Sequence, residues 1–320
     1  MSNPFFSILI TSHDPSRKNL LFQAIESALR QDVIENFEII VIKSYSEKEV
    51  DEFLKNIDVI VIDTDEIFSG PKILLGLKES KGEFIAFLDD DDLFHIHKLS
   101  RIYQEILNDP DLALIKHNVN FINYKNELIG KNDNKFLQNL QNDLVFFSGN
   151  LPDRYQYMLM HFSRSSSMVI NSRILREQKD RLKEIFVTPD LYIFAAFLLS
   201  EGKGLIIKEE LGSYRIHSSV SNLYGGSAEK ITSTIKRFKD DQITVLSLYK
   251  DKGRMDLYKK HLSIVSRFNL WEAFNNFQTT GKVGTFKFSD IGYALFGQPS
   301  SYTYKNGLIF IFKGFLRLIR

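Results

Sequence analysis

Four consecutive aspartates, Asp89 to Asp92, follow the apolar segment 84–88. This segment has the composition of a strand, and side chains alternate at a strand end, so Asp89 and Asp91 are expected to share a side. Ionised carboxylates this close repel one another unless a cation or protons offset their charge. Carboxylate oxygens suit Mg²⁺ or Mn²⁺, which proteins hold with one or two carboxylates plus phosphate oxygens. The run therefore predicts metal–phosphate chemistry; the alternative is a solvated acidic turn in which Asp92 caps the next helix.

The composition excludes several other chemistries. The 320 residues include no cysteine, which rules out disulfides, thiolate metal sites and a cysteine nucleophile, and which fits a cytoplasmic protein. Lys and Arg total 41 against 40 Asp and Glu, so there is no global basic field and we expect no nucleic-acid partner. The N-terminus lacks the basic start of a signal peptide, and no uncharged stretch reaches the roughly 18–20 residues that cross a bilayer.

The elements that must position the aspartates alternate along the first ninety residues. Apolar runs predict strands and amphipathic runs predict helices, Ser46 being the expected N-cap of one helix. The strands are expected at 6–10, 37–42, 59–62 and 83–88, and the helices at 18–31, 46–54 and 71–80. This order predicts an α/β fold with a mostly parallel sheet and helices on both faces. Ligands of such sheets bind beyond the carboxyl ends of the strands, which here are residues 11–14, 43–46, 63–70 and 89–92.

The second half of the chain has a different pattern. Between about 112 and 225 the alternation breaks into mixed strands, loops and helices, and beyond Gly225-Gly226 the chain has a helical pattern, with helices at 231–249 and 257–274. We therefore expect one domain over 1–225 and a helical region over 226–320.

The last fifteen residues, 306–320, form a separate feature. Asn306, Lys313, Arg317 and Arg320 share one helical face, and the other residues are apolar except two glycines. Such a helix is expected to lie in the headgroup layer of an anionic leaflet, which would place the protein on the inner face of the cell membrane. The alternative is a helix docked on the first domain or on a second copy of the chain in a homodimer.

Three segments together carry a resemblance to a known family. They are 76–92, with Lys81-Gly82-Glu83 before the aspartates; the opening 7–12 with its helix ending at Gln31; and 211–221, which contains Tyr214-Arg215-Ile216-His217. In combination these segments, which span about 1–222, resemble the family 2 glycosyltransferases of GT-A fold. Residues 1–225 would then be the nucleotide-sugar-binding and catalytic domain.

The resemblance implies an activity and roles for the aspartates. The protein is expected to be a metal-dependent, inverting glycosyltransferase that moves a sugar from a UDP- or GDP-linked donor to a hydroxyl of a glycan or lipid-linked acceptor. Asp89 and Asp91 would be the metal pair for Mg²⁺ or Mn²⁺: Asp91 would contact the ion directly, and Asp89 would face the ribose or a metal-bound water. Asp90 is expected beside the nucleotide sugar. His217 would complete the metal shell or reach a diphosphate oxygen.

Two further residues receive roles from the resemblance. Asp190, in Thr188-Pro189-Asp190, stands where the family carries the general base that deprotonates the acceptor. The alternative is a first-turn acid that the helix dipole stabilises. Arg215 is expected to carry a phosphate charge or to pair with one of the strand-end carboxylates.

The chain also departs from the family pattern. Lys43-Ser44-Tyr45-Ser46 stands where the family carries acids that contact the nucleobase. Base recognition is therefore expected from Tyr45 stacking or from Asp63 and Asp65, with Thr11 and Ser44 also at the nucleotide. Lys72, at a helix start, would meet a phosphate or simply face solvent.

Some polar residues are interpreted as structural. The serine run in 164–168 has the composition of a polar turn that leads into a strand, and the acceptor side of the site is the alternative position. His95 and His97 are expected to point apart on a helix, so we assign them no metal role.

Two other functions remain open. The missing acids at 43–46 favour a non-catalytic binding scaffold with the GT-A fold. Asp63-Thr64-Asp65 after a strand resembles haloacid-dehalogenase-type phosphohydrolases, although Ile67 and the lack of a later GDxxxD depart from that pattern.

Overall fold

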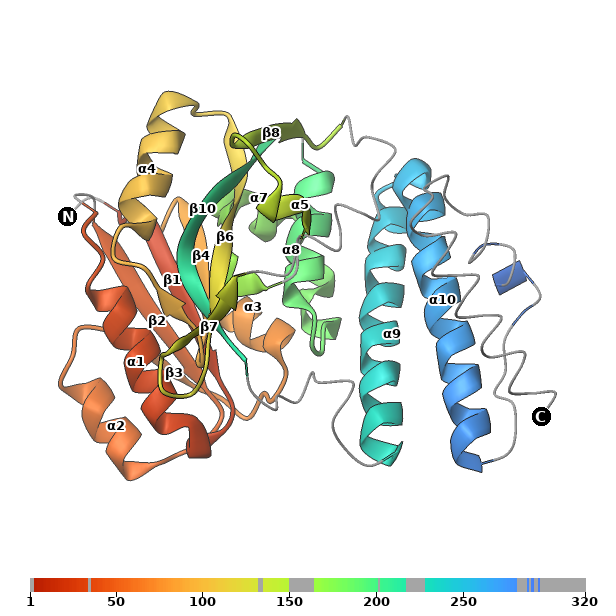
Figure 1. Ribbon diagram of the computed structural model, residues 1–320, viewed down its shortest axis with the longest axis horizontal. Helices are drawn as coiled ribbons and strands as arrows, with labels where there is room; N and C mark the ends of the chain where they lie inside the picture. The colour runs from red at the N-terminus through yellow and green to blue at the C-terminus, as the bar shows by residue number, and fades with distance from the viewer. Residues whose placement is uncertain are drawn as a thin grey trace. The chain divides into compact units, whose positions relative to one another are not determined.

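The structure is a computed structural model that describes residues 3–33, 36–131, 135–149, 164–200, 202–216, 228–280, 287, 289–290 and 293. The described residues fall into an α/β unit that ends at 216 and a helical unit that begins at 228 (Figure 1). The boundary predicted near 225, His217 and the terminal segment 306–320 lie outside the described residues.

The first ninety residues form the predicted alternation of strands and helices. The elements are β1 (Phe6–Ser12), η1 (Pro15–Arg17), α1 (Lys18–Leu29), β2 (Phe37–Lys43), α2 (Lys48–Lys55), β3 (Ile60–Asp63), α3 (Ser69–Glu79) and β4 (Phe84–Asp89). The N-cap predicted at Ser46 is wrong by one residue. Glu47 caps α2 because its side chain accepts from the amide of Val50, whereas the hydroxyl of Ser46 donates to Asp51.

The strands β3-β2-β1-β4 lie side by side in that order and are all parallel. Phe6 is in register with both Phe37 and Phe84, so the three strands start at one edge. Thr11 is opposite Asp89, and Ser12 is opposite Lys43. The carboxyl ends of β1, β2 and β4 therefore meet at a single edge of the sheet, as the sequence predicted.

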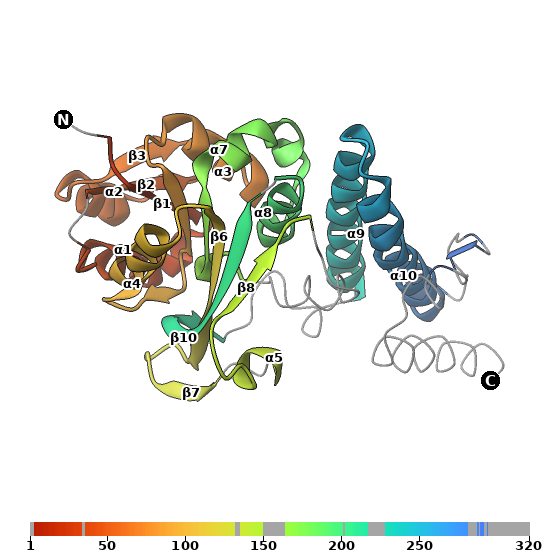
Figure 2. The ribbon, with the colours of Figure 1, turned by 90° about the horizontal axis from the view of Figure 1, so that it is seen from above.

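Alternating side chains of these strands pack against helices on the two faces. Ile8 and Val41 belong to the core that α1, α2 and α4 (Lys98–Asn108) cover. Leu9 and Ile42 point the other way, toward α3, where a Cβ on Gly76 would lie 2.9 Å from Ile42 Cδ1. A glycine at this position lets α3 approach the sheet closely. Figure 2 shows α1 and α4 on one side of the sheet and α3 and α8 (Pro189–Leu198) on the other.

Beyond β4 the sheet is mixed. Its further strands are β5 (Leu93–Phe94), β6 (Leu112–Ile122), β7 (Leu128–Lys131), β8 (Leu144–Phe147), β9 (Met168–Asn171) and β10 (Lys203–Arg215). Strand β9 runs antiparallel between β4 and β6, and β10 runs parallel to β6. The helical pieces between them are α5 (Lys135–Gln138), η2 (Ser165–Ser167), α7 (Ser172–Glu177) and η3 (Lys179–Glu184).

The helix expected through His95 and His97 starts later than predicted. The chain after the aspartates pairs with β10 as β5, and α4 begins at Lys98 with His97 as its N-cap residue. His95 lies before the helix, where Nδ1 is 2.8 Å from the carbonyl of Glu210 and Nε2 is 3.0 Å from the hydroxyl of Ser213. Pairing with β10 satisfies the backbone here and displaces the helix start.

The helical unit consists of two long helices, α9 (Ala228–Asp251) and α10 (Met255–Thr280), both longer than predicted. Gly253 turns the chain between them with a φ of +69°, a value that glycine adopts without strain. The rings of Phe238 and Phe268 stack across the pair at 6.4 Å. Among the helices in the described ranges, none has both the length and the apolar character that crossing a bilayer requires.

His261 on α10 makes the stability of this helix pair depend on pH. It is fully buried and contacts the carbonyl of Gln242 on α9 at 3.2 Å. Burial lowers the pKa of His261 from 6.5 to about 3. Between these values the unfolded chain binds a proton that the folded chain rejects. As far as His261 contributes, the free energy of unfolding is therefore highest above pH 6.5. It decreases as the pH drops toward 3, by at most about 1.4 kcal/mol per pH unit.

The single tryptophan, Trp271 on α10, reports this transition by fluorescence. Urea unfolding at pH 7 and pH 5 should show a smaller pH difference for His261→Asn than for the wild type. An equal pH difference in the two proteins would show that other groups cause the acid sensitivity.

Candidate active site

Strand β4 carries Asp89 to the common edge of the sheet, and a turn then holds the other three aspartates. The amide of Asp92 donates to the carbonyl of Asp89 at 3.2 Å and closes this turn. Asp90 and Asp92 are 3% and 1% exposed, whereas Asp89 and Asp91 are half-buried. The alternation of the strand thus continues into the turn as an alternation of burial.

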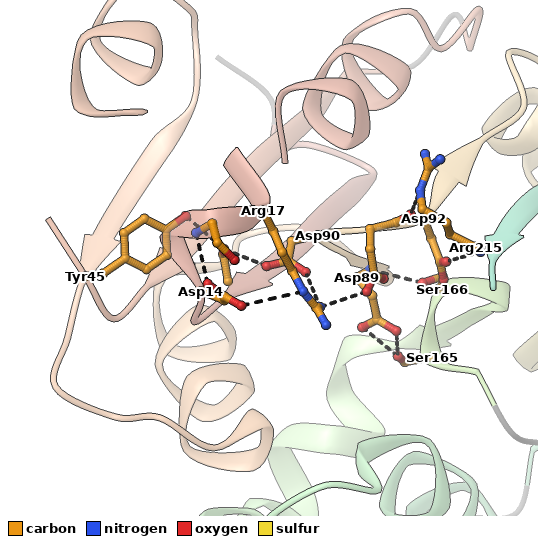
Figure 3. Close-up of polar contacts among 12 residues, drawn as sticks. Asp14, Arg17, Tyr45, Asp89, Asp90, Asp92, Ser165, Ser166 and Arg215 are labelled. Carbon is orange, nitrogen blue, oxygen red and sulfur yellow. Dashed lines mark hydrogen bonds and ion pairs between the residues drawn. The ribbon is translucent and has the colours of Figure 1, made fainter. Parts of the chain in front are cut away.

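Asp89 and Asp90 accept hydrogen bonds from neighbouring serines. The hydroxyl of Ser165 lies 3.0 Å from each carboxylate oxygen of Asp89, and the amide of Asp89 donates to Ser166 Oγ at 3.0 Å (Figure 3). Ser12, at the end of β1, donates to Asp90 at 2.6 Å. The serine turn and β1 therefore fix the first two aspartates from opposite sides.

Asp91 and Asp92 have different partners. Arg17 Nη1 lies 2.8 Å from Asp91 Oδ2 and 3.4 Å from Asp90 Oδ1. Asp92 accepts from the amide of Arg215 at 3.0 Å through Oδ1, and its buried Oδ2 has no hydrogen-bond partner among the described residues. Asp92 does not cap a helix, which was the alternative interpretation, because the chain continues from it into β5.

The electrostatics of the run confirm that its charges are crowded. Burial and the nearby charge of Asp91 raise the pKa of Asp89 to about 7 and the pKa of Asp90 to about 6. The same two causes raise the pKa of Asp92 well above its usual value. Burial and mutual repulsion both disfavour the ionised carboxylates here, and a bound cation offsets both effects.

The donor set fits a divalent cation that also binds phosphate. The available ligands are carboxylate oxygens, one of which, Asp92 Oδ2, is buried and has no hydrogen-bond partner in the part of the chain that the structure describes. In the ranges that the structure describes, no three His, Cys, Asp or Glu side chains converge as a ready-made metal site. One or two carboxylates that share the ion with substrate phosphates are the usual arrangement for Mg²⁺.

Lys72 joins the ends of β1 and β2 and is not the solvent-facing lysine of the alternative interpretation. It is 1% exposed, and its ammonium donates to the carbonyl of Ser12 at 2.6 Å and to Ser44 Oγ at 2.9 Å. Desolvation lowers the pKa of Lys72 to about 8. The phenol of Tyr45 lies 3.0 Å from Ser12 Oγ, so these residues surround the end of β1.

A second charged group lies at the ends of β2 and β3. Lys43 is 3% exposed and pairs with Asp63 and, at 2.9 Å, with Asp51. Beside it is a cavity of about 850 Å³ lined by Lys43, Ser44, Tyr45, Ser46, Asp51, Leu54, Lys55, Ile57, Val59, Val61, Asp63, Thr64 and Asp65. The lysine that replaces the family's acid thus brings carboxylates from two other elements to the same place.

Asp190 lies in the first turn of α8, after Pro189. Its Oδ2 accepts from the amide of Arg164 at 2.8 Å and its Oδ1 from the amide of Leu191 at 2.9 Å. The charge of Asp190 is the smallest of the causes that raise the pKa of Asp89, so the two carboxyl groups interact electrostatically. Arg164 adopts a φ of +74°, and its guanidinium lies 4.8 Å from the ring of Tyr214.

The serine run forms the predicted turn but also belongs to the site. Ser165–Ser167 is the buried 3-10 turn η2 before β9. Lys98 donates to the carbonyl of Ser166 at 2.7 Å, and Lys116 donates to the hydroxyl of Ser167. Because Ser165 binds Asp89 while the preceding residue, Arg164, binds Asp190, this turn connects the two carboxyl groups. The interpretation as a merely structural turn is therefore incomplete.

Arg215 contacts the aspartate turn in a way that the sequence did not predict. Its guanidinium donates to carbonyl oxygens, at 2.7 Å to Asp91 and 2.6 Å to Asn123, and lies 3.2 Å from Gln23 Oε1. Its contact with a carboxylate is made by its backbone amide. Arg215 therefore holds the loops around the turn in place.

Two residues of the site, Ser12 and Arg17, were missed by the sequence reasoning, and the serine run was interpreted as structural. Ser12 lies within the strand-end segment 11–14 that the fold indicated, and the serine run was visible as a cluster. Arg17 gave no signal, because an arginine at the start of a helix is ordinary and its partners are 73 and 74 residues away.

Comparison with known proteins agrees with the fold. The model of the family described as glycosyl transferase family 2 matches residues 7–169. An uncharacterized glycosyltransferase of Rickettsia bellii is 42% identical over 88 residues, which are 26% of this chain and 13% of that protein. One of Haemophilus influenzae is 31% identical over 114 residues, which are 35% of this chain and 37% of that protein. The matches thus span only a minor part of either relative.

Solved structures share the fold. S. aureus TarS has a TM-score of 0.57 at 14% identity, over 91% of this chain and 47% of that chain. TarS 1–349 in complex with UDP has a TM-score of 0.56 at 13% identity, over 98% of this chain and 88% of that one. TarS 1–349 in complex with UDP-GlcNAc has a TM-score of 0.53 at 12% identity, over 86% of this chain and 87% of that one. With the family model covering half of the sequence, including the aspartate run, the chain belongs to glycosyl transferase family 2.

Proposed function

We propose that the protein transfers a sugar from a nucleoside diphosphate donor to an acceptor hydroxyl, by a single displacement that inverts the anomeric carbon. The observation that carries this proposal is the arrangement of Asp190 and the aspartate run, which the turn Arg164–Ser165 joins directly. One carboxylate near a charged cluster provides a base on one side of the reacting carbon and a cation site on the other. Because the chain belongs to glycosyl transferase family 2, the phosphohydrolase alternative is not favoured.

On the donor side, we propose that Asp89 and Asp91 hold Mg²⁺ or Mn²⁺ together with diphosphate oxygens. A divalent ion there supplies Lewis-acid stabilisation of the charge on the leaving diphosphate. Ser165 keeps Asp89 oriented by contacting both of its oxygens. Thr11, Ser44 and Asp90 lie along the same strand ends. Lys72 contributes by holding the ends of β1 and β2 together.

The nucleobase is proposed to bind in the cavity at the ends of β2 and β3, with Tyr45 as the stacking ring. UDP and UDP-GlcNAc occur in the TarS complexes, so we propose a uridine nucleotide here. The imide N–H of uracil is a donor, and the Asp63 carboxylate, which Lys43 holds at the rim, is a matching acceptor.

An Asp63→Ala protein is expected to bind UDP roughly ten times more weakly, since a hydrogen bond to a charged group contributes about 1.5–3 kcal/mol. Asp58→Ala is the matched control, because Asp58 is an exposed acid of the same region that does not line the cavity. Isothermal titration with UDP and Mn²⁺ measures both. If the Asp63→Ala protein keeps the wild-type affinity, the carboxylate does not read the base.

On the acceptor side, Asp190 is proposed as the general base. Two backbone amides, those of Arg164 and Leu191, hold its carboxylate in one orientation. Because Asp190 stands in the first turn of α8, the helix mounts this carboxylate rigidly. A glycan or lipid-linked acceptor, binding of 306–320 to a membrane and a homodimer stay predictions.

A thermal-shift panel tests the function as a whole. Specific binding to the native state raises the melting temperature, so UDP with Mn²⁺ should raise it more than UDP alone or GDP with Mn²⁺. Release of UDP from UDP-GlcNAc in the presence of Mn²⁺ then tests turnover. If UDP raises the melting temperature equally with and without Mn²⁺, and no UDP is released from UDP-GlcNAc, the result would favour the non-catalytic binding scaffold.

A further inference from the structure

Arg17 occupies the carboxylate that the proposed cation needs. It is the last residue of η1, directly before α1, yet its guanidinium reaches across to the turn after β4. Nη1 contacts Asp91 Oδ2 at 2.8 Å and Asp90 Oδ1 at 3.4 Å, and Nε lies 3.9 Å from Asp14 Oδ2. Figure 3 shows Arg17 extended between Asp14 and the aspartate run.

The pair is largely removed from water but is not geometrically ideal. The side chains of Arg17 and Asp91 are each 14% exposed. A guanidinium binds a carboxylate or a phosphate best through two parallel hydrogen bonds to one anion. Here the same nitrogen, Nη1, contacts two different carboxylates, and the contact with Asp90 is long. Arg17 therefore offsets the charge of the aspartates without the fork geometry that would make the pair strongest.

The position of the pair is the second part of the argument. The carboxyl ends of β1 and β4 are neighbours, with Thr11 opposite Asp89, and ligands of such sheets bind beyond these ends. A diphosphate bound there would offer the guanidinium a bidentate partner. A divalent cation at Asp91 would at the same time repel the guanidinium from the oxygen that both contact.

We propose that Arg17 is a placeholder cation, which neutralises Asp91 in the donor-free protein and moves to the diphosphate when the divalent ion and the donor bind. This inference rests on the proposed function and adds a coupling to it. The ion alone must compete with Arg17 and binds weakly. With the nucleotide present, Arg17 gains a partner, so the ion and the nucleotide each strengthen the binding of the other by the same factor.

Binding of Mn²⁺ alone to the full chain, followed by the EPR signal of the free ion, tests the competition without any turnover. Arg17→Gln is expected to bind Mn²⁺ about tenfold more tightly than the wild type, because the competing charge is gone. At saturating Mn²⁺ the same variant is expected to bind UDP about tenfold more weakly, because the diphosphate loses a charge-assisted hydrogen bond.

Two further variants separate the placeholder role of Arg17 from a general effect of the protein's net charge. Lys18→Gln makes the same change in net charge one residue away, at a lysine that pairs with Glu47 and Glu49, and should bind Mn²⁺ like the wild type. Arg17→Lys keeps the charge without the fork, so Mn²⁺ alone should still bind weakly while UDP affinity falls. The Lys variant also serves if Arg17→Gln folds poorly.

The outcomes are distinguishable from failure of the proposed function. If the wild type shows no Mn²⁺-dependent UDP binding, the proposed function fails. If it does show such binding, but Arg17→Gln binds Mn²⁺ alone no more tightly than the wild type, or Lys18→Gln gains as much, the placeholder role is overturned.

Discussion

An Asp190→Asn protein is expected to bind UDP and Mn²⁺ like the wild type but to transfer sugar about 10²–10⁴-fold more slowly, the range over which a positioned general base acts. Asparagine has the shape of aspartate but cannot take up the proton of the acceptor hydroxyl. Because the amides of Arg164 and Leu191 contact the two carboxylate oxygens separately, one of them will face the new NH₂ group.

Because the new NH₂ group faces a backbone amide, the Asp190→Asn protein needs controls for folding and for the chemical change itself. A melting curve shows whether the variant is folded, and Asp180→Asn, an exposed first-turn acid of η3, makes the same chemical change away from the site. The measurement is UDP release from UDP-GlcNAc in the presence of Mn²⁺, beside UDP affinity by calorimetry. Turnover within about threefold of the wild type, a difference of under 1 kcal/mol in barrier, would place the base elsewhere.

The second large effect is expected at Asp91. An Asp91→Asn protein should lose Mn²⁺-dependent UDP binding and transfer sugar about 10³-fold more slowly, since a Lewis acid contributes several kcal/mol to stabilising the transition state. Its melting temperature should not fall. The charge of Asp91 helps to raise the pKa of Asp89, Asp90 and Asp92, so neutralising it relieves repulsion within the run and offsets the loss of its ion pair with Arg17.

Loss of function without loss of stability is the signature that separates Asp91 from a structural residue. Asp109→Asn, which removes a surface partner of Lys203, is the matched control and should change neither quantity by much. EPR of Mn²⁺ in the presence of UDP gives the binding result directly. Wild-type Mn²⁺-dependent UDP binding in Asp91→Asn would remove this carboxylate from the cation site.

The spacing of apolar residues along the chain was sufficient to predict the first half of the fold. The strands and helices up to Asp89 are confirmed to within a few residues, because apolar periodicity reflects burial on the two faces of the sheet. Their order places the ends of β1, β2 and β4 at one edge, so Ser12, Ser44 and the aspartate run could be expected together from the sequence. The sequence likewise indicated that four adjacent carboxylates need a cation or protons, and burial together with the nearby charge of Asp91 raises the pKa of Asp89 and of Asp90.

Only the tertiary structure decided which distant side chains complete the site. Ser165 and Asp89 are 76 residues apart, and Arg17 and Asp91 are 74 apart; β9 and the loop after β1 bring them together. Lys72 was expected at a phosphate or in solvent, yet it is buried between two strand ends. These contacts depend on the insertion of β9 beside β4 and on how far each loop reaches. No short-range periodicity encodes these features, because they depend on which non-adjacent segments pack together.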